Sequence, residues 1–167
     1  MATYFITEQY VKDNSPITNN VDPKLIYPHI DGAERLWIRA VLGSDFYEYL
    51  KSAFDAQTLN PDEVELVQNW IKPAELWRAI SMALPWMQWS VRNKGLQTQN
   101  DDFSSPAGTG ETKWMINEAA NRAQFYEDQL KRWLKENENK FPQFVNQSTA
   151  LDQPDRSSSW DSGLIFY

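Results

Sequence analysis

The chain has 167 residues, of which 41% are hydrophobic and 23% are charged, so it carries enough apolar side chains for one packed domain. Its net charge of −7 argues against a sequence-independent grip on DNA or anionic lipid, because both need clustered Lys and Arg. The absence of cysteine excludes disulfides and thiolate chemistry. Residues 1–6 lack a signal-peptide pattern and no apolar run is long enough for a membrane span, so we expect a soluble protein made in a cytoplasm.

The aromatic content of the chain is high, with eight Trp, seven Tyr and eight Phe. Large rings bury much area per residue, both in domain cores and in the centres of protein interfaces. Most of these rings should lie in the core. Eight Trp in one small domain nevertheless favour some of them facing a partner.

Helix start and stop signals divide the first third of the chain. Thr7 is a candidate N-cap for a short helix over 7–14. Asp22 followed by Pro starts a second helix that ends at Gly43, and Pro28 should kink this helix or delay its start. Ser44 is expected to cap the next helix, which carries Phe and Tyr side chains on its apolar face.

The middle of the chain predicts two further helices. Asn60 and Glu63 have the spacing of a capping box at the start of the first, which runs through Ile71. Pro73 starts or kinks the next helix. Apolar residues lie on more than one side of that helix, so it should be central or at an interface, and Pro85 should kink it.

Residues 93–110 break the helical pattern with turn residues, and Leu96 begins a run that could form one strand of a small hairpin. The longest helix is expected over 111–139, with Met115 in its apolar stripe and Pro142 ending it. The fold class is therefore mainly α: a bundle of about five helices with a small β-hairpin or extended loop and an extended C-terminal arm. We expect a helical domain over 1–145 and the arm over 146–167.

The arm is polar through Ser159 and then becomes apolar over Trp160–Tyr167. Leaving its large apolar side chains in water would cost roughly 1.5–3 kcal/mol each. Two interpretations remain open. The arm can fold back onto its own core, or it can dock on a neighbouring subunit, for example as an added strand.

No residue pattern points to catalysis. His29 is the only histidine, and it follows a proline among structural signals, so a packing role is favoured over a catalytic or metal-binding one. The run Gly108–Lys113 superficially resembles a phosphate-binding loop. A glutamate stands where the lysine must be, so these residues predict a loop entering a helix. We expect no catalytic residue, no cofactor and no metal.

Two carboxylate clusters have residue types that can serve in acid–base catalysis or bind magnesium. Asp101 and Asp102 fall in a polar loop, and Glu136 and Glu138 fall at a polar helix end. Solvated charge is the favoured interpretation for both clusters.

The order of segments resembles that of small helical head-to-tail connector (adaptor) proteins of tailed bacteriophages, nearest to those of crAss-like and other Bacteroidetes phages. The resemblance covers roughly residues 5–145 and rests on order and spacing. The stretches that carry it are Ile6–Lys12, Ile26–Ile30, Ala40–Leu50, Trp70–Ala74 with Ala83–Trp86, Asn93–Gly95, Arg122–Glu127 and Phe141–Phe144.

The resemblance implies a structural virion protein that forms a ring, usually of roughly twelve copies, below the portal at the head–tail junction. Its implied partners are other copies of itself, the portal protein and the next neck or tail ring protein, with no membrane. An acidic surface would suit a channel through which DNA slides without specific binding. The protein would lie in the virion neck, and in the host cytoplasm during assembly.

A different non-enzymatic phage protein of the neck or tail, such as a tail-completion or stopper protein, is the alternative function. Under either function, two regions are candidate interfaces: the loop after residue 92 and the apolar end of the arm. The candidate interface residues are Lys94, Gly95, Leu96, Phe103, Trp160, Leu164, Ile165, Phe166 and Tyr167.

Overall fold

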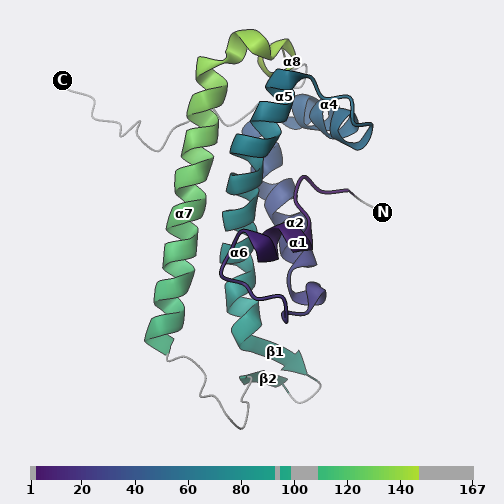
Figure 1. Cartoon of the computed structure of the whole chain (residues 1–167). Coiled ribbons are helices and arrows are strands. Elements are labelled where there is room, and N and C mark those ends of the chain that lie inside the picture. Colours follow the sequence, from purple (N-terminus) through teal and green to yellow (C-terminus); the bar gives the residue numbers. More distant parts are fainter. Residues whose placement is uncertain (1–2, 93–94, 99–108, 147–167) are drawn as a thin grey trace, which may run out of the picture.

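Two long antiparallel helices, α6 (Lys72–Gln88) and α7 (Thr109–Glu136), pack along each other and carry the rest of the molecule (Figure 1). The computed structural model describes residues 3–92, 95–98 and 109–146. Within these residues the protein is mainly α-helical, as the sequence predicts. The other helical elements are, in chain order, α1 (Glu8–Asp13), η1 (Pro23–Leu25), α2 (Tyr27–Ala33), η2 (Glu34–Ile38), α3 (Arg39–Leu42), α4 (Ser44–Asp55), α5 (Pro61–Glu65), η3 (Leu66–Ile71), η4 (Glu138–Lys140) and α8 (Pro142–Val145).

The helix starts follow their sequence signals closely. The Thr7 hydroxyl accepts a hydrogen bond from the amide of Tyr10, which confirms the predicted N-cap of α1. Asn60 and Glu63 form the predicted capping box, each side chain accepting from the other residue's backbone N–H at 2.9 Å. Pro28 delays the second helix, which begins as the 3₁₀ turn η1 and becomes α-helical at Tyr27.

The helices expected on either side of Pro73 are one continuous run from α5 to α6. The π-helical segment η3 lies directly before the proline, and Lys72 donates its backbone N–H to the carbonyl of Val67, five residues back. Proline has no N–H to give to an α-helical ladder, and a π-turn lets the chain pass such a point without ending the helix. The segment η2 makes a second π-turn between α2 and α3.

Gly43 separates α3 from α4. Its φ of 76° and ψ of 153° lie in a region that is essentially restricted to glycine, and the chain turns there. The prediction that Ser44 caps α4 is wrong. Gly43 occupies the cap position, Ser44 is the first helical residue, and its hydroxyl instead accepts a hydrogen bond from Arg39.

The predicted hairpin is confirmed. Strands β1 (Trp89–Arg92) and β2 (Gly95–Thr98) pair antiparallel, with Val91 opposite Leu96, and form the end of the molecule below α6 (Figure 1). The predicted C-terminal arm lies outside the described residues, apart from Asn146.

Buried apolar side chains gather in two clusters. The first joins α4, η3, α8 and the C-terminal half of α7, around Phe46, Leu66 and Leu134. The second joins α1, α2, α6 and the N-terminal half of α7, around Ile30, Ile80 and Ala119. Helices α6 and α7 contribute to both clusters. The prediction that α6 is central is confirmed, because it buries residues on more than one side.

Within the described part of the chain, no helix has the length and apolar character needed to cross a membrane.

Candidate interaction surface

An apolar groove of about 400 Å³ lies between α6, α7 and the N-terminal loop that follows α1. Its walls are the side chains that project from the facing sides of the two long helices, and the loop closes one edge. We call this feature the α6–α7 groove. Its lining residues are Pro16, Ile17, Thr18 and Val21 from the loop, Trp77, Ile80, Leu84 and Met87 from α6, and Trp114, Met115, Glu118, Ala119 and Arg122 from α7.

Large apolar side chains stand open to solvent at this groove. Trp114 is 66% exposed and Met115 is 46% exposed, although Met115 lies at helical spacing from the buried Ala119. Met115 was predicted within the packing stripe of α7. It lies near the N-terminal end of the helix, where α7 has fewer neighbours to cover it. Exposed apolar groups gathered around a concave surface are typical of binding sites for proteins or apolar ligands.

The groove also carries a charged rim. Arg122 donates to Glu118 at 2.8 Å along α7, and its guanidinium lies over the ring of Trp77 at 4.7 Å. Both partners of this ion pair are about half exposed, so the pair adds little stability. It does fix the position of the Trp77 ring at the edge of the groove.

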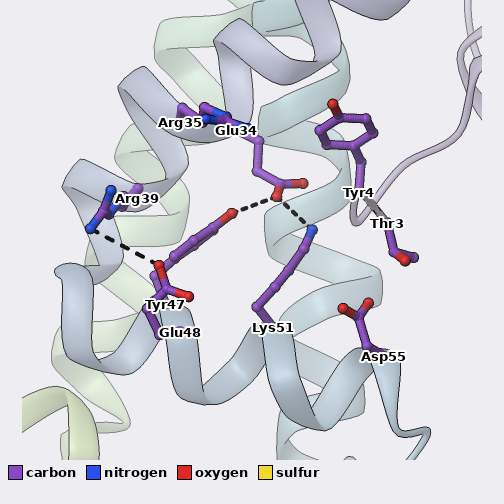
Figure 2. Close-up of a pocket in the computed structure, with 9 residues that line it drawn as sticks. All are labelled: Thr3, Tyr4, Glu34, Arg35, Arg39, Tyr47, Glu48, Lys51 and Asp55. Carbon is purple, nitrogen blue, oxygen red and sulfur yellow. Dashed lines mark hydrogen bonds and ion pairs between the residues drawn. The ribbon is translucent and has the colours of Figure 1, made fainter. Parts of the chain in front are cut away.

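A second, polar pocket of about 350 Å³ lies between the N-terminal segment, η2 and α4 (Figure 2). Glu34 is at its base and is 1% exposed. The Glu34 carboxylate accepts hydrogen bonds from the Tyr47 hydroxyl at 2.6 Å, the Lys51 ammonium at 2.5 Å and the Phe5 backbone N–H at 2.9 Å. These contacts tie the N-terminal segment to η2 and α4, so this pocket has an evident structural role.

Glu75 adds a second buried carboxyl beside this network. It is 0% exposed, and neither of its carboxyl oxygens accepts a hydrogen bond from the described residues. Burial, and then the charge of Glu34, raise the pKa of Glu75 well above its usual range. The neutral acid avoids the repulsion that two charged carboxylates would have there. Burial and the hydrogen bond to Glu34 likewise raise the pKa of Tyr47.

A further ion cluster joins the two long helices. Arg78 on α6 donates to Glu127 on α7 at 2.6 Å, and Lys131 lies 3.4 Å from the same carboxylate. The Arg78 guanidinium also lies 4.8 Å from the centre of the Trp37 ring. All of these charges are largely buried and mutually paired, so the cluster fixes the register of α6 against α7.

His29 packs against Trp86 with ring centres 6.5 Å apart, and burial lowers the pKa of the imidazole. No group of three potential metal ligands occurs among the described residues. Thr109 to Lys113 of the run that resembles a phosphate loop belong to α7, which begins two residues before the predicted start at residue 111.

The interface residues predicted from sequence are placed only in part. Gly95 and Leu96 lie in β2, at the end of the molecule opposite α8 (Figure 1). The remaining predicted interface residues lie outside the described part of the chain: Lys94, Phe103, Trp160, Leu164, Ile165, Phe166 and Tyr167. Sequence reasoning missed the α6–α7 groove. The sequence features that could have indicated the groove are the apolar residues on a second side of α6 and the Trp114–Met115 pair near the start of α7.

One protein family matches the sequence over residues 38–153, more than half of the chain: DUF6712, described as a family of unknown function. The chain belongs to the DUF6712 family. No curated protein and no solved structure matches it. The matched region of this DUF6712 protein includes the helical walls of the α6–α7 groove, whereas the loop at the edge of the groove precedes it.

Proposed function

We propose that this DUF6712 protein is a structural subunit of a tailed-phage virion, forming a head-to-tail connector ring that docks below the portal. The observation that carries the proposal is the α6–α7 groove, with Trp114 and Met115 exposed on it. A subunit of a cyclic ring needs two different complementary surfaces, and apolar aromatic surface commonly supplies the centre of such contacts. The resemblance of residues 5–145 to connector proteins gives the proposal its phage context.

The charge of the protein also supports this role. A net charge of −7 disfavours adhesion to DNA, so a ring built from such subunits could surround a passing duplex without holding it. The Glu34 carboxylate and the ion cluster of Arg78, Glu127 and Lys131 have structural partners and need no substrate to explain them.

The test is co-expression with the portal protein encoded in the same genome, followed by electron microscopy of the purified particles. Ring density beneath the portal is the expected result. A bare portal beside free monomer would contradict the proposal and favour a lower ring or a tail-completion role, which is the alternative function.

A matched pair of variants makes this test specific to the groove. Trp114→Ser combined with Met115→Ser should abolish the ring, whereas Leu36→Ser, at an equally exposed site on η2, should leave it intact. Circular dichroism of both variants should match the wild type, because none of the three side chains is in the core. Equal loss of the ring in both variants, or in neither, would contradict a role for the groove.

A further inference from the structure

We infer that the α6–α7 groove binds the apolar segment Trp160–Tyr167 of a neighbouring copy. This inference rests on the proposed ring function and names the occupant of the groove. The two surfaces match in chemistry. The groove presents Trp, Met, Leu and Ile side chains, and the segment carries Trp160, Leu164, Ile165, Phe166 and Tyr167 with a single charged residue, Asp161.

Contact between the groove and the segment would remove apolar surface of both from water. Burying a large apolar side chain contributes roughly 1.5–3 kcal/mol, and several such side chains are available on each side of the contact. A groove of about 400 Å³ has room for two or three large side chains of an extended peptide.

The length of the connecting chain favours a neighbouring copy as the source of the segment. The described structure ends at Asn146, past the C-terminal end of α7, while Trp114 lies near the N-terminal end of that helix. At 1.5 Å per residue the helix alone separates Trp114 from Glu136 by about 33 Å. Thirteen residues, 147–159, connect Asn146 to the segment, and an unstructured chain of that length has an average span of roughly 20 Å.

Reaching its own groove would therefore require the stretch 147–159 to be stretched well beyond its average span, at an entropic cost. A neighbouring copy arranged head to tail, with its groove beside the α8 end of this copy, can present that groove within that span. Groove and segment are then the two different surfaces that a head-to-tail ring contact requires.

Disulfide trapping tests the inference directly, because the natural chain has no cysteine. Full-length Met115→Cys and full-length Phe166→Cys proteins are mixed and oxidised, both alone and after co-assembly with the portal. Val64→Cys replaces Met115→Cys in the control. It is similarly exposed, and it lies on α5 near the end of the molecule that holds Asn146. If the segment Trp160–Tyr167 had no binding site, its cysteine should react more readily with Val64→Cys, because that position is nearer to Asn146.

We expect a cross-linked heterodimer of Met115→Cys and Phe166→Cys at least fivefold more abundant than the control product, under one or both conditions. Equal yields in the two mixtures would overturn the inference. A chain carrying both cysteines should form interchain products. If it formed only an intrachain disulfide, the segment would occupy its own groove and the inference would be wrong.

The outcomes separate this inference from the proposed function. A ring below the portal without the Met115–Phe166 cross-link would retain the connector role and overturn the assignment of the groove's occupant. The cross-link without a ring would retain the contact and contradict the connector role.

Discussion

The Glu34–Glu75 pair predicts a defined dependence of stability on pH. Glu75 is held neutral in the folded protein, whereas in the unfolded chain it ionises near its ordinary pKa of 4.5. Its contribution to stability is therefore fully present below about pH 4.5 and is lost as the pH rises toward its folded pKa. In that window each pH unit shifts the unfolding equilibrium by up to tenfold, or about 1.4 kcal/mol.

Glu75→Gln isolates this effect. Glutamine has nearly the shape of the neutral acid, and it does not ionise in either state. The free energy of unfolding should be measured by urea denaturation at about pH 5, 6 and 7 for both proteins. The difference between the two proteins cancels the titration of groups that do not interact with Glu75.

The variant should gain stability relative to the wild type as the pH rises, by up to about 1.4 kcal/mol per pH unit. Glu65→Gln, which changes an exposed carboxyl on α5, serves as the control, and its difference from the wild type should stay flat. A flat difference for Glu75→Gln, or a loss of stability that grows with pH, would refute the reasoning. Either result would mean that Glu75 is charged in the folded protein.

Three further predictions concern stability in urea. Leu134→Ala, at a fully buried site, should lower the free energy of unfolding by about 2–5 kcal/mol. Leu36→Ala, at a site 61% exposed, should change it by less than about 0.5 kcal/mol, and similar values for the two variants would contradict the position of Leu134 in the core. Asn60→Ala should cost about 1 kcal/mol and Asn60→Gly only a few tenths, and an equal cost would argue against the side-chain cap. Gly43→Ala should cost about 1–3 kcal/mol because of the backbone conformation there, and a neutral result would contradict that conformation.

Sequence reasoning succeeded where local chemistry decides structure. The Thr7 cap, the Asn60–Glu63 box and the delay at Pro28 each depend on residues within one helical turn, and the structure confirms all three. At Pro73 the sequence predicts a helix start or a kink, and α6 does begin at Lys72, but the proline signal gave no indication of the π-turn that joins it to α5. Sequence reasoning failed at Ser44 because Gly43, whose φ is positive, already occupies the cap position.

The groove and the buried carboxyls could not be predicted because they depend on distant parts of the chain. Glu34 bonds to Lys51, 17 residues away, and to Phe5, 29 residues away. A glutamate within a helix gives no sequence signal of burial. The groove likewise needs the loop at Ile17 to lie against α6 and α7, and that placement follows from tertiary packing.

The two apolar clusters have a consequence for how the molecule opens. Each cluster packs its own set of short helices, and only α6 and α7 contribute to both. Transient unfolding of α1 and α2 would therefore leave the cluster around Phe46 and Leu134 intact. Amide protons in these short N-terminal helices should exchange with deuterium sooner than those in the C-terminal half of α7. A protein with this division can adjust the end that carries the groove while its other end stays folded.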